Sequence, residues 1–265
     1  MRFTHSVLRG EARLIWKLNI RMKDAGCRGQ KGEARRAKSE KEDGSEFGGQ
    51  AGKARPARAM SGGLFVAGGR VYWRCDLSQL LKILVAITGA SGALYAQRLL
   101  DNLDPQQHEI HVVLSNYAHQ VIAEELPGGL RLPEGVKPYG LKSMNVPFAS
   151  GSNPPDAMVV IPCTMGTLGR IAHGYSEDVL LRAADVALKE RKKLILVPRE
   201  TPVSLIHVKN FELLLLAGAT LIPANPSFYM GPKTIVEVVD TVVARVLDHL
   251  GVKQTLVQRW SEEAE

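Results

Sequence analysis

Several charged side chains stand at spacings that could bind an anion. Arg182 and Lys189 lie seven residues apart, and therefore on one face of a predicted helix. Arg199 and Glu200 lie in the loop 198–202, which begins and ends with a proline that restricts the backbone. A solvated basic face and a surface ion pair are the simpler interpretations of these two groups. The position of each group in the fold distinguishes an anion-binding site from a solvated surface.

Other candidate residues are ambiguous by themselves. Tyr229 lies in a Pro-rich loop, Arg245 lies on the last predicted helix, and Glu125 would by default be a solvated residue at a helix end. Cys163 has no His–Asp partner that the pattern assigns, so we interpret it as a small buried residue. The seven histidines show no metal-ligand spacing, and the sequence predicts no metal site.

The stretch 82–95 supplies the first element that could position these residues. Residues 82–87 form a β-branched apolar run typical of a buried strand, and an apolar pattern at helical spacing follows the turn Thr88-Gly89-Ala90-Ser91-Gly92. Backbone N–H groups at a helix start attract anions, and small residues let a phosphate come close. The pattern indicates a nucleotide or flavin phosphate site. The alternative is a tight turn with Ser91 as an N-cap and no ligand.

Strands and helices alternate regularly from residue 82 onward, which predicts an α/β fold: a doubly wound, Rossmann-like parallel sheet with helices on both faces. Turns suited to ligand binding follow Ile87, Leu114, Ile161 and Val197. All four lie at the carboxyl ends of strands, where such sheets bind ligands. The other predicted strands are 109–114, 157–161 (ended by Pro162), 194–197 and 220–222. The other predicted helices are one that follows the turn 163–167 and runs through Ile171, and 116–126, 178–192, 204–217 and 234–250; residues 127–155 are predicted as mainly loop.

Charge is concentrated at the start of the chain. Residues 1–60 hold 15 of the 34 Lys and Arg residues but 7 of the 27 Asp and Glu residues, and the remainder is almost neutral. We therefore expect neither nucleic acid nor a membrane as a partner of the folded part. The predicted organisation is a basic, disordered extension over 1–80, a catalytic domain over 81–252 and a tail over 253–265, with Met60 as an alternative start.

The three cysteines are too widely spaced for a disulfide framework or a zinc motif, which favours a reducing compartment. The N-terminus lacks the apolar core of a signal peptide, and no run of 18 apolar residues occurs. These features favour a cytoplasmic protein.

Residues 82–250 resemble the UbiX-type flavin prenyltransferases. The matching stretches are Thr-Gly-Ala-Ser-Gly-Ala (88–93), Ala-Ser-Gly-Ser (149–152), Pro-Cys-Thr-Met-Gly-Thr-Leu (162–168), Arg-Ala-Ala-Asp-Val-Ala-Leu-Lys-Glu-Arg (182–191), Leu-Val-Pro-Arg-Glu-Thr-Pro (196–202) and Phe-Tyr (228–229). The resemblance covers about two thirds of the chain. One departure is Met144, where some relatives have Trp, so an aromatic wall on that side is in doubt.

The resemblance implies an enzyme that joins the dimethylallyl group of dimethylallyl monophosphate to N5 and C6 of reduced FMN. The product, prenylated FMN, would pass to a UbiD-type decarboxylase, in ubiquinone or aromatic-acid metabolism. No metal is implied, and relatives assemble as homododecamers.

The resemblance also assigns site residues. It implies FMN binding by Gly89, Ala90, Ser91, Ser115, Thr164, Met165, Gly166, Thr167 and Arg199. It implies dimethylallyl phosphate binding by Arg182, Lys189, Glu200, Tyr229 and Arg245, and catalytic roles for Ser91, Glu125, Lys189 and Glu200. Breaking an allylic C–O bond develops negative charge on the phosphate, which Arg and Lys can stabilise.

Two other functions remain open at this point. An FMN-dependent decarboxylase of cysteine-containing peptides shares the fold and would need a catalytic His on the helix after the second strand, where His119 lies. A non-catalytic flavin carrier would need only the FMN site. The basic residues at 182, 189 and 245 argue against a carrier, because FMN alone needs no second phosphate site. A short-chain dehydrogenase would carry Tyr-x-x-x-Lys on a helix. Tyr229 and Lys233 have this spacing by accident, because Pro232 lies between them and breaks a helix.

Overall fold

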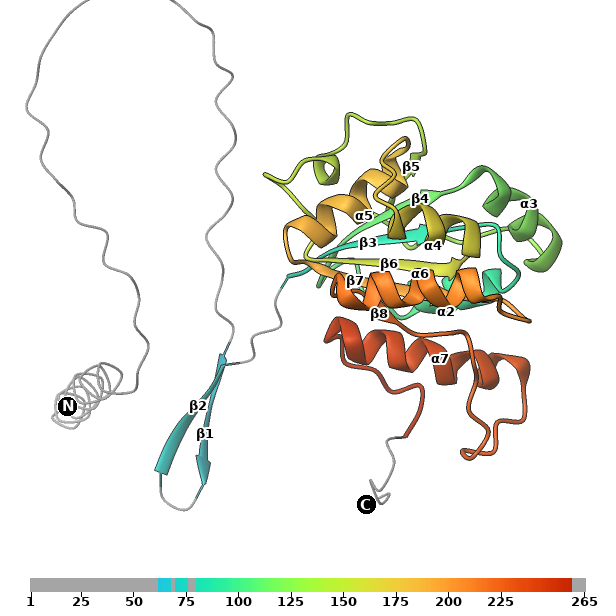
Figure 1. Ribbon diagram of the computed structural model, residues 1–265. Helices are drawn as coiled ribbons and strands as arrows, with labels where there is room; N and C mark the ends of the chain where they lie inside the picture. Colours follow the sequence, from blue (N-terminus) through green and yellow to red (C-terminus); the bar gives the residue numbers. More distant parts are fainter. Residues whose placement is uncertain (1–61, 68–69, 76–79, 259–265) are drawn as a thin grey trace, which may run out of the picture. The chain divides into compact units, whose positions relative to one another are not determined.

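Three apolar runs of the sequence form strands of a six-stranded sheet (Figure 1). The computed structural model describes residues 62–67, 70–75 and 80–258, and β3 (Lys82–Ile87), β6 (Ala157–Cys163) and β7 (Lys193–Pro198) are its most apolar strands. Every residue of β3 and β6 is buried. Continuous apolar runs are typical of parallel strands that are covered on both faces.

The order of the strands is β5-β4-β3-β6-β7-β8, and every neighbouring pair is parallel. The chain runs from β3 outward through β4 (Glu109–Leu114) to β5 (Lys137–Gly140), then returns to β6 beside β3 and continues outward to β8 (Thr220–Leu221). The direction therefore reverses between β3 and β6. Doubly wound sheets bind ligands at this reversal, outside the carboxyl ends of the strands. The predicted fold class is confirmed.

Helices cover both faces of the sheet (Figure 1). One hydrophobic core lies under α2 (Ala93–Asp101), α3 (Asn116–Glu125) and α7 (Ile235–Leu250). The other lies under the short 3-10 helix η1 (Pro147–Ala149), α4 (Met165–Ala172), α5 (Val179–Lys189) and α6 (Leu205–Leu216). Side-chain oxygens of Ser115, Thr164, Asp178, Ser204 and Thr234 accept a backbone N–H at the helix starts, which explains where α3 to α7 begin.

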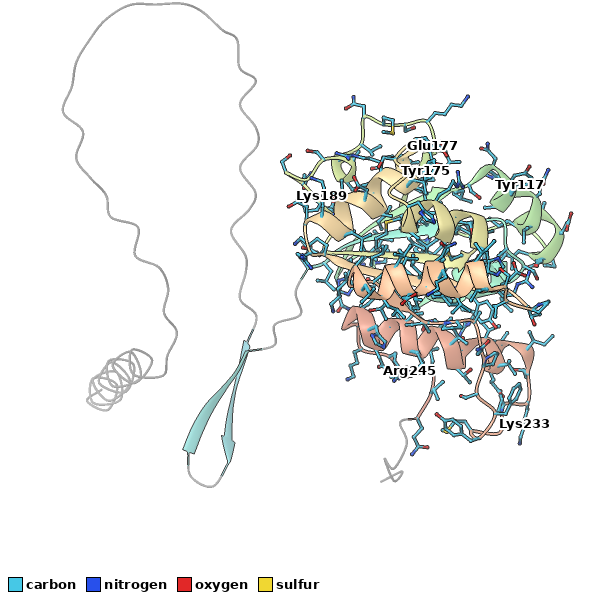
Figure 2. The ribbon with its side chains drawn as sticks, viewed as in Figure 1. Tyr117, Tyr175, Glu177, Lys189, Lys233 and Arg245 are labelled. Carbon is cyan, nitrogen blue, oxygen red and sulfur yellow. The ribbon has the colours of Figure 1, made fainter. Side chains whose placement is uncertain are left out.

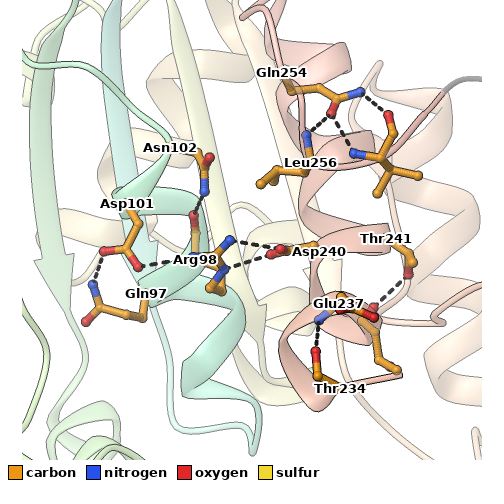
Figure 3. A network of polar contacts seen from close by, with 12 residues as sticks. Gln97, Arg98, Asp101, Asn102, Thr234, Glu237, Asp240, Thr241, Gln254 and Leu256 are labelled. Carbon is orange, nitrogen blue, oxygen red and sulfur yellow. Dashed lines mark hydrogen bonds and ion pairs between the residues drawn. The ribbon is translucent and has the colours of Figure 1, made fainter. Parts of the chain in front are cut away.

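A bidentate ion pair between Arg98 and Asp240, which lie 142 positions apart in the sequence, joins α2 to α7 (Figure 3). Both bonds from the Arg98 guanidinium to the Asp240 carboxylate measure 2.8 Å, and Asp240 is only 7% exposed. This parallel geometry is the strongest form of the Arg–carboxylate interaction. It holds α7, which carries Arg245, against the helix that follows the turn after β3.

The strand at 157 is longer than its sequence predicts. The prediction that Pro162 ends this strand at Ile161 is wrong, because β6 continues to Cys163. The register between β6 and β7 shifts between Val160 and Cys163, and a proline that cannot donate to a ladder is tolerated at such an irregularity. The Pro162 carbonyl instead accepts hydrogen bonds from Thr88.

Two further differences from the prediction are larger than a shift of one residue at the end of an element. Helix α5 ends at Lys189 instead of residue 192, since Arg191 has a φ of 54° and cannot continue a right-handed helix. The stretch 127–155 contains β5 and η1, whose four and three residues are too short to give a readable hydrophobic period.

The structure also contains an unpredicted antiparallel hairpin. It pairs β1 (Gly62–Ala67) with β2 (Arg70–Cys75), inside the stretch 1–80 that the sequence assigns to an unstructured extension. The predicted disorder of residues 1–61, with the alternative start at Met60, lies outside the described residues. No helix of the described part of the chain is both long and apolar enough to cross a membrane.

Candidate functional site

The Thr88 hydroxyl joins the carboxyl ends of β3 and β6 at the reversal of strand order. Its oxygen donates to the Pro162 carbonyl (2.7 Å) and accepts the Thr164 N–H (2.8 Å). The Thr88 N–H also donates to the Pro162 carbonyl (3.2 Å). Thr88 is 1% exposed, so these bonds satisfy its polar atoms inside the protein. Thr88 therefore links the two turns by hydrogen bonds, and its buried hydroxyl is not available to a ligand.

Three candidate residues from distant parts of the chain gather at the turn after β3. The Glu125 carboxylate, at the end of α3, accepts the N–H groups of Gly92 (2.8 Å) and Ala93 (2.7 Å) at the start of α2, and it also bonds the Ser91 side chain. Arg199, at the end of β7, donates through Nε to the Ser91 carbonyl (3.2 Å). Glu125 is thus bound to a helix N-terminus, where a carboxylate is favourable, and it orients the Ser91 hydroxyl.

The pKa of the Glu125 carboxyl reflects these contacts. Burial alone would raise it. The hydrogen bonds from Ser91 and from two backbone N–H groups outweigh burial, and together with the Arg199 guanidinium they hold the pKa below its ordinary value of 4.5.

A pH dependence of stability follows from this shift. Because the folded pKa lies below the unfolded one, ionised Glu125 stabilises the fold above about pH 4.5, and this contribution is lost as the pH falls through the lowered pKa. We expect wild type to exceed Glu125→Gln in free energy of unfolding at neutral pH, with a difference that shrinks below about pH 4. Urea unfolding at two pH values, one neutral and one below about pH 4, measures this difference in the free energy of unfolding. Glu124→Gln, at the exposed neighbouring position of α3, is the matched control. A wild-type advantage unchanged between the two pH values would contradict this assignment.

The turn after β4 lies against the turn after β3. The Ser115 N–H donates to the Ile87 carbonyl (2.9 Å), and its hydroxyl caps α3 by accepting the Ala118 N–H (3.2 Å). A Cβ on Gly89 would lie 2.3 Å from the Tyr117 Cβ, which no folded protein accommodates. Glycine at position 89 is therefore required for the two turns to approach, and Ala90 beside it is buried.

The N-terminus of α4 completes this edge of the sheet. Thr164 caps the helix, with its Oγ1 accepting the Thr167 N–H at 3.1 Å and donating to Thr167 Oγ1 at 3.0 Å. Gly166 is exposed, and a Cβ there would meet no atom within 4 Å, so space is open above the first turn. First-turn N–H groups lack partners inside a helix and suit a phosphate. We name this cluster, Gly89 to Ser91, Ser115, Thr164 to Thr167 and Arg199, the flavin edge, after the ligand that the sequence resemblance predicts for these residues.

A cavity of about 630 Å³ lies between α7, the loop after β8 and the C-terminal segment. Tyr229 and Arg245 both line it, together with Asp248, to which the Arg245 guanidinium is ion-paired at 3.5 Å. The structure therefore brings two of the five predicted phosphate ligands to one space. The remaining lining residues are Ile222, Pro223, Asn225, Ser227, Thr241, Val242, Ala244, Gln254, Val257 and Gln258.

The C-terminal segment forms one wall of this cavity, although the sequence indicates only a tail there. Gln254 holds the segment: its Oε1 accepts the N–H groups of Leu256 (2.8 Å) and Val257 (3.2 Å), and its amide donates to the Val257 carbonyl (3.3 Å; Figure 3). Leu256 packs on the hydrophobic core. Hydrophobic periodicity could not reveal this wall, because a side-chain amide organises it.

Arg182 lies in the first turn of α5, and Lys189 ends the helix towards the opposite edge of the sheet. The Arg182 guanidinium donates to the Ala149 carbonyl (3.0 Å), in the loop that precedes β6. A Cβ on Gly151 would lie 2.8 Å from Lys189 Nζ, so glycine allows the lysine to approach the same loop. Figure 2 shows Lys189 at one end of the sheet and Tyr117, beside the flavin edge, at the other. The seven residues of β6 separate the edges by about 20 Å.

Glu200 is exposed beside Arg199, and its carboxylate accepts the Thr201 N–H at 3.1 Å. One chain thus presents the predicted residues in three places: the flavin edge with Ser91, Glu125 and Glu200, the cavity of Tyr229 and Arg245, and helix α5 with Arg182 at its start and Lys189 at its end. The structure does not unite the five predicted phosphate ligands within one chain.

The fold and the edge define the class: a doubly wound α/β protein in which helix starts and Arg199 gather at the reversal of strand order. The profile of the Flavoprotein family matches residues 76–247. Two curated relatives, each a flavin prenyltransferase UbiX, come from Methanocaldococcus jannaschii (44% identity; 68% of this chain, 98% of the relative) and Pseudomonas aeruginosa (42% identity; 69% and 95%).

Solved structures agree with this result. A UbiX protein in complex with FMN and dimethylallyl pyrophosphate has a TM-score of 0.63 at 36% identity, covering 69% of this chain and 98% of that one. A dodecameric FMN-dependent UbiX-like decarboxylase from Escherichia coli O157:H7 has a TM-score of 0.65 at 40% identity, covering 68% and 100%. The chain belongs to the Flavoprotein family, among the UbiX-type flavin prenyltransferases, and is a prenyltransferase.

Proposed function

We propose that this protein transfers the dimethylallyl group of dimethylallyl monophosphate to N5 and C6 of reduced FMN, with release of phosphate. The observation that carries the proposal is the presence of two separate places for anionic groups: the flavin edge, with Arg199, and the cavity of Arg245 and Tyr229. A flavin carrier needs the first alone. The relative solved with FMN and dimethylallyl pyrophosphate binds two such ligands.

The residues of the flavin edge fit a flavin phosphate, because they combine capped helix starts, small residues and one guanidinium. We propose that Thr164 to Thr167, Ser115 and Arg199 hold FMN, with Gly89, Ala90 and Ser91 against the flavin. Bound reduced FMN supplies the electron pair that captures the allylic carbon. Glu125 orients the Ser91 hydroxyl through its own hydrogen bond to Ser91.

The cationic residues neutralise the charge of the departing phosphate in this proposal. Monophosphate is a poor leaving group, and guanidinium and ammonium groups stabilise the negative charge that develops on it. We assign this role to Arg245, Arg182 and Lys189, with Tyr229 as a hydrogen-bond donor and Glu200 beside the reacting region. The proposal requires no metal, since these side chains provide the positive charge.

A single chain cannot perform this reaction if Lys189 belongs to the phosphate site, because Lys189 lies at the other edge of the sheet, about 20 Å from the flavin edge. We therefore propose a homo-oligomer in which one copy contributes the flavin edge and a neighbour contributes Arg182 and Lys189. The E. coli relative is dodecameric. The proposed catalytic unit is residues 81–252 with the wall at 253–258, and a UbiD-type decarboxylase is the proposed recipient of the product.

Anaerobic incubation with reduced FMN and dimethylallyl monophosphate tests the proposal. Mass spectrometry should detect flavin that has gained one C5H8 unit, together with one free phosphate per product. Flavin that binds tightly but gains no mass would overturn it in favour of a carrier. Carbon dioxide release from a cysteine-containing peptide, without flavin prenylation, would favour the peptide decarboxylase.

A further inference from the structure

Lys82, the first residue of β3, is only 6% exposed, although lysine is rarely buried unless it is paired. Its ammonium donates a hydrogen bond to the neutral amide oxygen of Asn153. Removing an ammonium from water costs free energy, and a single amide oxygen offsets this cost less well than a carboxylate does. An apolar residue at the start of β3 would avoid the cost. The reason for a lysine at this position therefore lies in what its ammonium contacts.

The loop 150–156, which joins η1 to β6, is fastened to the start of β3 through Lys82. The Lys82 N–H donates to the Asp156 carboxylate (3.0 Å), and the Asp156 N–H donates to the Lys82 carbonyl (2.8 Å). The same carboxylate accepts a hydrogen bond from Lys192 Nζ (3.3 Å). The two backbone bonds would persist with any residue other than proline at position 82. Only the ammonium reaches back to Asn153, in the middle of the loop.

The first four residues of this loop form one hydrogen-bonded turn. The Asn153 N–H donates to the Ser150 carbonyl (3.1 Å), which closes the turn 150–153. Inside it, the hydroxyls of Ser150 and Ser152 lie 2.9 Å apart, and the Ser152 N–H donates to the Ser150 hydroxyl at 3.3 Å. Asn153 and Gly151 therefore belong to one small unit, and a displacement of Asn153 displaces Gly151 with it.

The Lys189 ammonium lies against the same turn. A Cβ on Gly151 would lie 2.8 Å from Lys189 Nζ and 2.2 Å from Glu190 Oε1, and these two charged groups are ion-paired at 3.0 Å. The Lys189 side chain is 46% exposed, and an exposed lysine has many rotamers of similar energy. The Gly151 backbone and Glu190 therefore determine where the ammonium lies. Lys82 fixes one corner of the turn, and Lys189 lies against another.

We propose that Lys82 is a positioning residue for the phosphate of the substrate: through Asn153 and the turn 150–153, its ammonium determines the place of Lys189. The inference rests on the proposed function, in which Lys189 binds the phosphate of dimethylallyl monophosphate. Lys82 is buried, and the six residues of β3 separate it from the flavin edge by about 20 Å. It therefore affects the affinity for dimethylallyl monophosphate and leaves the affinity for FMN unchanged.

Three variants of the full-length chain test this role. Lys82→Met removes the ammonium, and Asn153→Ala removes its partner at a half-buried position outside the strands. Lys193→Met is the matched control, because Lys193 also begins a strand, β7, and its ammonium also donates to neutral oxygens. These are the carbonyls of His249 (3.0 Å) and Leu250 (3.3 Å), in the last turn of α7 and not in the loop 150–156.

Calorimetric titration of dimethylallyl monophosphate into the complex with oxidised FMN measures substrate binding without turnover, because oxidised flavin lacks the electron pair that captures the allylic carbon. We expect Lys82→Met and Asn153→Ala each to weaken this binding about tenfold, the usual effect of one hydrogen bond to a charged group. FMN affinity, measured by fluorescence quenching, should equal that of wild type in both variants. The control should bind both ligands as wild type does, and circular dichroism checks the fold of each variant.

Combination with Lys189→Ala distinguishes positioning from a general loss of stability. If Lys82 acts through Lys189, Lys82→Met with Lys189→Ala should bind dimethylallyl monophosphate no more weakly than Lys189→Ala alone. A further loss of affinity in this double variant would contradict the proposal, as would wild-type affinity in Lys82→Met or in Asn153→Ala. If Lys82→Met does not fold, the same comparison with Asn153→Ala decides.

The result separates this inference from the proposed function. Wild type that prenylates FMN, with Lys82→Met and Asn153→Ala variants that keep the wild-type affinity for dimethylallyl monophosphate, would contradict the positioning role alone. The expected affinities in a protein that never prenylates FMN would support the positioning role and contradict the proposed function. Wild type that does not bind dimethylallyl monophosphate would contradict both.

Discussion

Replacing Arg245 by alanine is expected to slow prenylation about a hundredfold while FMN still binds. Arg245 lines the cavity with Tyr229 and lies on α7, whereas the flavin edge is built from the ends of β3, β4, β6 and β7. A charge-assisted contact to a phosphate in the transition state contributes on the order of 3 kcal/mol, which gives this factor. Single-turnover prenylation, followed by mass spectrometry, measures the rate.

Arg199→Ala is the matched comparison, because it removes the same group from the flavin edge. Its Nε contacts the Ser91 carbonyl, so we expect weaker FMN binding in this variant. Fluorescence quenching of FMN measures the affinity of both variants. Equal loss of FMN affinity in Arg245→Ala and Arg199→Ala would contradict the assignment of Arg245 to a second phosphate.

The sequence predicts the fold well where one physical signal is sufficient. Strands β3 and β4 have the predicted bounds, because apolar runs end at turn residues, and α6 and α7 begin directly after Ser204 and Thr234, which cap them. Strand β5 could not be predicted, since four residues carry no period. The end of β6 was misplaced because the rule that proline ends a strand ignores the irregular register that accommodates Pro162.

Side-chain geometry accounts for what the sequence could not say about the site. Strand order brings Ser91 and Arg199 to one edge, and the pattern of strand-ending turns predicts this. No pattern indicates that Glu125 binds the start of α2, that Tyr117 needs glycine at 89, or that Gln254 forms a cavity wall. The spacing of Arg182 and Lys189 on one helix face is real, but spacing does not specify at which edge of the sheet the helix ends.

Two variants that are each inactive, Lys189→Ala and Arg199→Ala, are expected to regain activity when they assemble together. Each active site in the proposed oligomer takes its flavin edge from one copy and Lys189 from a neighbour. In a random one-to-one mixture, half of the flavin edges are intact and half of those have a neighbour with an intact Lys189, so about a quarter of wild-type activity should return. Co-expression of the two variants with different tags, followed by purification on both tags, gives the mixed oligomer.

A control mixture excludes trivial recovery. Ser91→Ala and Arg199→Ala both damage the flavin edge, so every flavin edge in their mixture lacks one group, and no activity should return. Recovery in the control as large as in the first mixture would mean that subunit contacts only restore stability. Absence of recovery in both would place Lys189 in the same copy as the flavin edge that it serves, or outside the site. Lys189 in the same copy would require a rearrangement of the chain, because that copy holds Lys189 about 20 Å from its own flavin edge. Lys189 outside the site would leave Arg245 as the main phosphate ligand.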